Sequence, residues 1–200
     1  RETVIKRTVL VLLIIATLAL SSCVDSAVGT YTAYSVAMDT QAAITVYGNN
    51  KASAEECARL FEQLDKLLSV TAENSSVAKL NKRGYVEASD ELSYIISQAN
   101  RIKEDTNGAF NVCVYPLVKL WGFTTGEYRV PTDDEIKAAA LSVASSSVWV
   151  ENGNVVLSEG ALVDFGAIAK GYASEKMAHI LKENGVGAAV ISLGGNIRTV

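Results

Sequence analysis

The sequence contains few of the residues that usually build metal centres and disulfide frameworks. Its 200 residues include one histidine and three cysteines. Cys57 and Cys113 lie far apart in the chain, and two such lone cysteines do not make a metal site. Cys57 falls on the apolar side of a predicted helix, so we expect a buried thiol there. One disulfide between the two cysteines is the alternative. We interpret the single histidine, His179, as a structural residue at or near the surface of a helix.

A basic excess is also missing. The formal net charge is −4, from 18 Lys and Arg against 22 Asp and Glu. Residues 1–22 hold three of those bases and one of those acids, so the rest carries 15 bases, 21 acids and a charge of −6. An acidic chain of this kind does not attract a phosphate backbone, which argues against nucleic acid as a partner.

The N-terminus carries an apolar run with the layout of a secretion signal. Three basic residues precede the stretch 8–20, whose 13 residues are too few to span a bilayer comfortably. Leu20-Ser21-Ser22-Cys23 then matches the bacterial lipobox. We therefore predict a lipoprotein signal peptide over 1–22, cleavage before Cys23 and lipidation of its thiol. An ordinary signal peptide or a short membrane anchor is the alternative.

Residues 23–37 are small and polar, which is typical of a tether between a lipid anchor and a folded domain. The lipid anchor predicts a location on the extracytoplasmic face of the bacterial cell membrane. The 178 residues from Cys23 onward suit one domain, which can bury a substantial core without help from disulfides.

The remainder alternates helix and strand signals without an internal repeat or a low-complexity run. Apolar residues at helical spacing, with capping or stop residues at several ends, predict helices over 54–68, 90–105, 132–140 and from the glycine after Asp164 to 183. Short apolar runs beside Gly-Asn turns predict strands over 42–47, 147–150, 155–157 and 188–193. This mixture predicts an α+β (mixed α/β) fold with one core.

Residues 164–171, Asp-Phe-Gly-Ala-Ile-Ala-Lys-Gly, hold the strongest functional signal. The apolar run 161–163 is predicted as a strand that leads to Asp164. A glycine turn follows, and the next helix carries Lys170 in its first turns. The first N–H groups of a helix lack partners within it and the macrodipole is positive there, so this end favours anions. The stretch suits nucleotide phosphates and their metal ion, although most junctions of this kind are plain turns.

Three other regions place glycines at strand–loop borders, where backbone can approach a ligand closely. They are Thr106–Asn111 with Tyr115–Phe123 behind it, Met38–Thr40, and Ser192–Asn196. Taken singly, each is typical of packing. We interpret Trp121 and Phe123 as core residues and Gly194-Gly195 as a turn.

Taken together, in this order and behind a lipobox, these segments resemble the ApbE family of flavin transferases. The resemblance runs from Met38 to Val200 and rests on the runs 164–172, 116–123 and 193–196. It implies a single T-fold-related domain over 38–200, incomplete at its C-terminal end. It also implies Mg²⁺ dependence, FAD as substrate, attachment of FMN to a threonine or serine of a target protein, and release of AMP. The implied targets are subunits of membrane redox complexes.

Position by position, the resemblance implies a set of site residues. Met38 would lie against the bound FAD, Asp164 would hydrogen-bond it, and Lys170 would offset phosphate charge. Ala167 would offer its backbone carbonyl oxygen to Mg²⁺. Three neighbouring residues would line the site, largely through backbone: Ala109, Phe110 and Asn111. This set is chemically coherent, because phosphoryl transfer mostly needs positioning and charge stabilisation.

The chain departs from the family pattern in two ways. Many members carry an aromatic residue in a Ser-Thr-Tyr segment after the first helix, where this chain has Ser69-Val70-Thr71. Thr71 cannot stack on a flavin ring. The remaining metal ligands and a candidate general base are expected downstream of Val200, so the base is not assigned. The alternative functions are an Mg²⁺-dependent FAD pyrophosphatase that releases FMN and AMP, and a non-catalytic, lipid-anchored flavin-binding protein.

Overall fold

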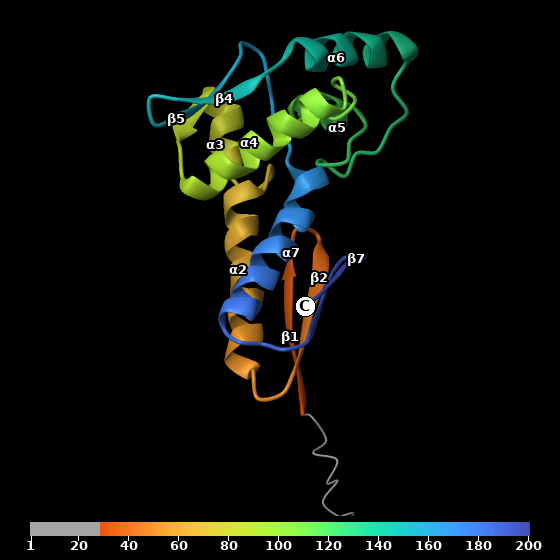
Figure 1. The fold of residues 1–200 in the computed structure, drawn as a ribbon. Helices are drawn as coiled ribbons and strands as arrows, with labels where there is room; N and C mark the ends of the chain where they lie inside the picture. Colours follow the sequence, from red (N-terminus) through yellow and green to blue (C-terminus); the bar gives the residue numbers. More distant parts are fainter. Residues whose placement is uncertain (1–28) are drawn as a thin grey trace, which may run out of the picture.

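The computed structural model describes residues 29–200, which form two antiparallel sheets and their covering helices (Figure 1). The predicted signal peptide and Cys23 lie outside these residues. Within the described part, no helix combines the length and the apolar character needed to cross a membrane. The mixed α/β architecture confirms the predicted fold class.

The first sheet has the strand order β1-β2-β6-β7, with each strand antiparallel to its neighbour. Its members are β1 (Thr30–Ala37), β2 (Thr40–Tyr47), β6 (Ala189–Leu193) and β7 (Asn196–Thr199). The long helices α2 (Lys51–Leu68) and α7 (Gly166–Glu183) lie side by side against one face of this sheet (Figure 1). Since strand side chains alternate between faces, every second residue along much of β1, β2 and β6 is buried.

Strand β1 corrects the predicted tether, because residues 30–37 belong to the folded domain. The whole of β1 pairs with β2. Ala33, Ser35 and Ala37 are buried, while Tyr34 and Val36 are exposed, which is the period-two pattern of a half-buried strand. The small and hydroxyl-bearing residues of this strand gave it the composition of a linker.

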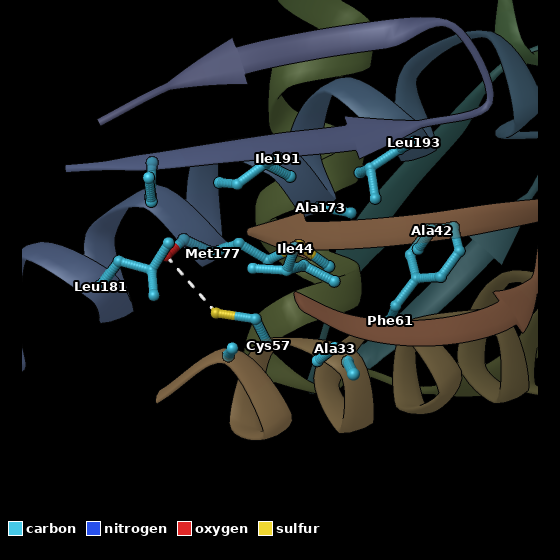
Figure 2. Close-up of a cluster of buried hydrophobic side chains, with 14 of the residues drawn as sticks. Ala33, Ala42, Ile44, Cys57, Phe61, Ala173, Met177, Leu181, Ile191 and Leu193 are labelled. Carbon is cyan, nitrogen blue, oxygen red and sulfur yellow. Dashed lines mark hydrogen bonds between the residues drawn. The ribbon is translucent and has the colours of Figure 1, made fainter. Parts of the chain in front are cut away.

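The core under the first sheet combines side chains from α2, α7, β2 and β6. Figure 2 shows Cys57 and Phe61 from α2 facing Met177 from α7, with Ile44 and Ile191 from the sheet between and beside them. All five side chains are fully buried. Burying large apolar side chains of this kind stabilises the fold by roughly 1.5–3 kcal/mol each. The packing of α7 on α2 therefore fixes where α7 begins, and with it the position of Asp164.

The second part of the fold lies beyond the ends of α2 and α7 (Figure 1). It has a three-stranded sheet of order β3-β5-β4 with its own core. The elements are α3 (Ser76–Arg83), β3 (Tyr85–Glu87), α4 (Asp90–Asp105), the short 3-10 helix η1 (Val112–Val114), α5 (Tyr115–Leu120), α6 (Asp133–Ser145), β4 (Val148–Glu151) and β5 (Asn154–Leu157). Figure 1 shows α6 at the far end of the molecule.

Local signals placed α4, α6, β4 and β5 correctly. The Thr132 hydroxyl accepts a hydrogen bond from the Glu135 N–H, and the Glu135 carboxylate accepts one from the Thr132 N–H, which is the predicted capping box of α6. The turn between β4 and β5 has Asn152 and Gly153 at positive φ, as a two-residue hairpin requires. The predicted helices and the strands predicted over 42–47, 147–150, 155–157 and 188–193 are thus confirmed, whereas β1, α3, β3, η1, α5 and β7 were not predicted.

The two described cysteines are buried and free, so the disulfide alternative is wrong and the predicted buried thiol is confirmed. The Cys57 thiol points at the carbonyl oxygen of Met177, with a sulfur–oxygen distance of 3.7 Å (Figure 2). Burial raises the pKa of Cys57 to about 12, because the thiolate would lose its hydration. Burial also raises the pKa of Cys113. Both groups are structural thiols rather than reactive ones.

His179 lies on the exposed side of α7, as expected. Its Nε2 is 3.4 Å from the Glu183 carboxylate one turn further along. The imidazole side chain is 70% exposed, so this pair is an ordinary surface contact.

Candidate functional site

A cavity of about 890 Å³ lies where the two parts of the fold meet. Five segments line it: the β1–β2 turn, the end of α2 with the loop behind it, α5 with its following loop, the start of α7, and the β6–β7 turn. The lining residues are Met38, Asp39, Thr40, Asp65, Leu68, Ser69, Val70, Thr71, Val118, Phe123, Thr124, Tyr128, Asp164, Gly166, Ala169, Lys170 and Gly194. This volume is near the upper end of the range for small-molecule sites, so the cavity can hold a ligand the size of a dinucleotide.

The β1–β2 turn brings a strained backbone to the cavity. Met38 and Asp39 have φ of 50° and 55°, so both occupy the left-handed region that residues other than Gly, Asn and Asp rarely adopt. The carboxylate of Asp65, near the end of α2, accepts a hydrogen bond from the Met38 backbone N–H at 3.1 Å. This bond holds the turn against α2. Met38 also packs against the hydrophobic clusters of both parts of the fold.

The β6–β7 turn lies against Thr40, the first residue of β2. Gly194 and Gly195 form the predicted turn, with φ of 54° and 92°. A Cβ at Gly194 would lie 2.3 Å from Oγ1 of Thr40, whereas a Cβ at Gly195 would meet nothing within 4 Å. Glycine at 194 is therefore required both by its φ and by the close approach of the Thr40 side chain.

Hydrogen bonds to its own backbone and to that of the residue before it hold Asp164 in place. The residue before it, Val163, has both of its backbone groups bound by the side chain of Asn81 in α3. Asn81 Nδ2 donates to the Val163 carbonyl at 2.8 Å, and Asn81 Oδ1 accepts from the Val163 N–H at 2.7 Å. The Asp164 N–H donates to the carbonyl of Val112 at 2.8 Å. Residues 161–163 pair with no strand of either sheet, which corrects the strand predicted there.

Helix α7 starts directly behind this anchored segment. The Asp164 carboxylate accepts a hydrogen bond from the Gly166 N–H at 2.7 Å, which satisfies one of the free donors of the first turn. Phe165 between them is fully buried and pins the entry into the helix. Lys170 follows in the next turn, half-buried, and lines the cavity with Asp164. The sequence prediction of a carboxylate, a helix start and a cation in one place is confirmed.

The charges around the cavity are mostly negative. Asp39, Asp65 and Asp164 contribute carboxylates and Lys170 contributes one ammonium group among the lining residues. A doubly charged phosphate ligand would gain from Lys170 and from the α7 start, and it would be repelled by the carboxylates. Phosphate binding here favours an additional cation.

The loop after α5 carries two exposed aromatic rings into the cavity lining. Phe123 is 62% exposed, so its interpretation as a core residue is wrong, whereas Trp121 is half-buried. The rings of Trp121 and Phe123 are nearly parallel, with centroids 6.5 Å apart and an interplanar angle of 12°. Tyr128 meets Phe123 edge-on at 6.2 Å and is 73% exposed.

Hydrogen bonds close this loop at its base. The Arg129 N–H donates to the carbonyl of Trp121, and its guanidinium donates to the carbonyl of Leu120 and to both carboxylate oxygens of Glu135. The Arg129 guanidinium, followed by the N–H and hydroxyl of Thr132, donates hydrogen bonds to the Glu135 carboxylate and lowers the pKa of Glu135 to about 2. Gly122 has φ of 79°, and a Cβ there would lie 2.1 Å from the carbonyl oxygen of Glu127. The loop is therefore tightly packed at its base.

Position 71, where many family members carry an aromatic residue, also belongs to the cavity lining. Thr71 lines the cavity, as its place in the sequence predicts, but it supplies a hydroxyl instead of a ring. Its Oγ1 lies 3.2 Å from Ser69 Oγ, which also accepts a hydrogen bond from the Ala72 N–H. This stretch of the lining is short and polar.

The remaining predicted site residues lie outside the lining set. Ala109 is exposed, and Phe110 packs against the core of the second part. Asn111 caps η1 through its Oδ1 and donates from Nδ2 to the Val143 carbonyl at 2.9 Å. Ala167 is an exposed residue in the first turn of α7. The structure thus brings Met38, Asp164 and Lys170 together, and the roles of these four others stay predictions.

The described residues do not by themselves make a magnesium site. Within 29–200, no group of three or more His, Cys, Asp or Glu side chains is placed to hold a metal ion. Mg²⁺ demands six oxygen ligands in near-octahedral geometry. At the start of α7 the chain offers the Asp164 carboxylate, already bonded to Gly166, and the Ala167 carbonyl, which points along a helix. This donor set is too small to hold the ion.

Comparison with known proteins decides the family. A model described as the ApbE family matches residues 38–200. The chain belongs to the ApbE family. The match covers all five segments that line the cavity, so the resemblance stated from the sequence is confirmed.

Two curated ApbE relatives carry the same name, "FAD:protein FMN transferase". The relative from Klebsiella pneumoniae (strain 342) is 30% identical over 182 residues, which cover 88% of this chain and 57% of the relative. The relative from Treponema pallidum (strain Nichols) is 31% identical over 157 residues, which cover 73% of this chain and 43% of the relative. The chain thus spans about half the length of these relatives.

Solved ApbE structures have the same fold. The ApbE protein from Thermotoga maritima superposes with a TM-score of 0.77 at 30% identity, over 86% of this chain and 59% of that one. The flavin transferase ApbE from Vibrio cholerae gives a TM-score of 0.73 at 25% identity, over 86% and 59%.

Sequence reasoning missed several residues of this site. Asp65 and Asn81 make their contacts to residues 27 and 82 positions away, and no local pattern reports such a pair. Tyr128 lies in a loop without periodicity. Thr40 belongs to the segment Met38–Thr40, which the sequence analysis had named as a possible site region. The signal for its neighbour in space, Gly194, was the glycine pair at the end of a predicted strand.

Proposed function

We propose that this protein is an FAD:protein FMN transferase. The observation that carries the proposal is that Met38, Asp164 and Lys170 line one cavity, in a chain whose curated relatives bear that name. The reaction transfers the FMN half of FAD to a hydroxyl of a target protein and releases AMP.

The proposed reaction is a phosphoryl transfer from FAD to a hydroxyl group of the target. The hydroxyl oxygen of a target threonine or serine forms a bond to the FMN phosphorus, the phosphoanhydride bond of FAD breaks, and AMP leaves with the bridging oxygen. The hydroxyl proton passes to a base that we do not assign. Catalysis of such a step depends mainly on positioning and on stabilising charge.

The residues of the chain have separate tasks in this proposal. Lys170 and the start of α7 face the negative charge that develops on the leaving phosphate. Asp164 hydrogen-bonds the flavin nucleotide through the carboxylate oxygen that Gly166 leaves free. Met38 lies against the bound ligand at the strained turn, whose position is fixed by Asp65.

The proposal includes Mg²⁺, with the Ala167 carbonyl as one ligand. The excess of carboxylates around the cavity supports a bound cation, because a pyrophosphate beside three aspartates would otherwise be repelled. Since the described donors are too few, no step of the mechanism is assigned to the metal.

A hydrolase is the second candidate, and the polar stretch at Ser69 and Thr71 favours it. Without a ring at position 71, water has easier access to the cavity than in relatives with an aromatic there. FAD pyrophosphatase activity differs from transfer only in the nucleophile that reaches phosphorus. A non-catalytic flavin-binding protein is the third candidate.

We also propose that the protein acts on the extracytoplasmic face of the bacterial cell membrane, tethered through lipid on Cys23. The support is the lipobox Leu20-Ser21-Ser22-Cys23. Its partners would then be subunits of membrane redox complexes that receive FMN. Mass spectrometry of Cys23 tests this directly, because an unmodified or uncleaved Cys23 contradicts the anchor.

The experiment for the function compares products with and without a target. Full-length protein is incubated with FAD and Mg²⁺, and free AMP and FMN are measured. A transferase releases AMP only when the target is present, and free FMN does not accumulate. Rapid release of both AMP and FMN without a target indicates the hydrolase. Bound FAD without any AMP indicates the non-catalytic binder.

The Asp164→Ala variant tests the site itself. We expect transfer to fall by roughly 10- to 100-fold, since a hydrogen bond to a charged group is worth about 1.5–3 kcal/mol. Glu159→Ala, a nearby exposed carboxylate outside the lining set, serves as the matched control. Equal activity in Asp164→Ala and wild type would remove Asp164 from the site.

A further inference from the structure

Two large rings stand exposed at the cavity although nothing in the described chain covers them. Phe123 and Tyr128 are the aromatic side chains among the lining residues, and they are 62% and 73% exposed. An exposed Phe ring beside a second exposed ring forms an apolar surface of the kind that marks binding sites. The cavity therefore has one aromatic wall, supplied by the loop after α5.

The arrangement of the rings suits a further planar group. Trp121 and Phe123 are stacked nearly parallel, and Tyr128 braces Phe123 by its edge. Aromatic pairs prefer offset stacking or edge-to-face contact at centroid distances of 4.5–7 Å, and both contacts of Phe123 fall in this range. The ring of Phe123 is thus fixed in orientation by two neighbours while most of its surface stays open.

The loop that carries Phe123 is preorganised. The Phe123 N–H donates to the carbonyl of Val118, and the carbonyl of Gly122 accepts from the N–H groups of Thr125 and Gly126. Arg129 closes the loop at Trp121 and anchors it to α6 through Glu135. A ring held in this way loses little conformational entropy when a ligand stacks on it.

Among the described residues, the other lining side chains include no aromatic ring. Ser69 and Thr71 present hydroxyl groups, and the α7 start presents Asp164 and Lys170. A flavin has a polar phosphate part and a large planar ring system. The charged groups of α7 suit the phosphate part, and the aromatic wall suits the ring.

We propose that Phe123, braced by Trp121 and Tyr128, is the platform on which the isoalloxazine ring of flavin stacks, in place of an aromatic residue at position 71. This inference rests on the proposed function, which makes a flavin nucleotide the ligand. The loop after α5 then determines flavin affinity in this protein, and the residue after the first long helix does not.

The test measures three ligands on full-length protein: FAD, FMN and ADP, the last of which lacks the flavin ring. Phe123→Leu removes the ring but keeps an apolar side chain, and we expect roughly tenfold weaker binding of FAD and FMN with unchanged binding of ADP. The quenching of flavin fluorescence on binding falls with it. Phe123→Tyr keeps the ring and retains wild-type affinity. Tyr85→Leu, an exposed ring on β3 outside the cavity, is the matched control and leaves all three affinities unchanged.

The outcomes separate this inference from the function on which it rests. Wild-type affinity for FMN in Phe123→Leu, with thermal unfolding unchanged, overturns the platform and leaves the transferase proposal standing. Weaker ADP binding with unchanged FMN binding assigns the ring to adenine and also overturns it. A wild-type protein that binds neither FAD nor FMN overturns both proposals. Restored flavin affinity in Phe123→Leu/Thr71→Tyr supports the idea that the two positions serve one purpose.

Discussion

Substitution of Asn81 should loosen the candidate site from a distance. Asn81 lies in α3 and touches neither Asp164 nor Lys170 by any hydrogen bond, yet its amide binds both backbone groups of Val163, at 2.7 and 2.8 Å. Val163 is fully buried, so water does not replace those bonds without disturbing the core. Asn81→Ala removes both bonds. Asn81→Asp keeps an acceptor for the Val163 N–H and turns the donor toward the carbonyl into a second acceptor.

The size of the effect follows from the two orphaned groups. Leaving a buried donor or acceptor unsatisfied costs about 1–3 kcal/mol. Two such groups, with partial relaxation, give a loss of about 2–4 kcal/mol for Asn81→Ala. This is a large fraction of the 5–15 kcal/mol that typically stabilises a domain. Asn81→Asp should cost about 2 kcal/mol, since one bond survives and two oxygens then face each other.

The assay combines urea unfolding with FAD binding. Because Val163 directly precedes Asp164, we expect both variants to weaken FAD binding as well as to lower the free energy of unfolding. Asn100 is the matched control: it is a half-buried asparagine of α4 that makes a single bond from Nδ2 to the Val148 carbonyl at 2.9 Å. Asn100→Ala should cost about 1 kcal/mol and leave FAD binding unchanged. The reasoning is refuted if Asn81→Ala is no more destabilising than Asn100→Ala, or if its FAD affinity equals that of wild type.

Three further predictions concern the turns and the core. Gly194→Ala should destabilise the protein by about 2–4 kcal/mol, because alanine is strained at this positive φ and its Cβ would clash with Thr40. Gly195→Ala should cost about 1 kcal/mol, because only the strain applies there. Equal urea midpoints for the two variants would contradict the close approach of Thr40 to Gly194. Asp65→Ala should cost about 1–2 kcal/mol and lower FAD affinity by freeing the Met38 turn, whereas Asp65→Asn, which keeps an acceptor oxygen, should retain most of both. The raised pKa of Cys57, about 12, means that folding favours the neutral thiol, so its contribution is complete below about pH 9 and is lost as pH rises from 9 toward 12. Unfolding measured at pH 7 and pH 10 should therefore show a loss on the order of 1 kcal/mol that is absent in Cys57→Ala.

The elements that could be predicted from the sequence are those whose signals are local. Helix α4 has its Ser89 cap and its buried face within one stretch, and α6 has a capping box that needs only Thr132 and Glu135. Strand β1 was missed because the small residues Ala33, Ser35 and Ala37 fill its buried positions, so its alternation carried little hydrophobic contrast. Helix α3 was missed although Ser75 caps it and Gly84 ends it, because its eight residues are mostly polar.

For the site, motif residues and positioning residues behaved differently. Asp164 and Lys170 could be found because a carboxylate, a glycine turn and a cation stand within a few positions of each other. The residues that hold them could not, because Asn81 and Asp65 act on backbone groups that only the tertiary fold brings near. Phe123 was misjudged as core because aromatic residues of this kind are more often core residues than ligand contacts. It is 62% exposed on a loop with a positive φ at Gly122, and no local pattern reports which way such a loop faces.

The most direct test of the central claim is the covalent product. Full-length protein is mixed with FAD, Mg²⁺ and a candidate redox subunit, and the target is examined for flavin fluorescence on a denaturing gel. The account predicts a fluorescent band at the target, absent without Mg²⁺, absent when the acceptor threonine or serine of the target is replaced by alanine, and strongly reduced with Asp164→Ala. No band, together with FMN and AMP free in solution, would contradict the transferase and identify the protein as a hydrolase of FAD.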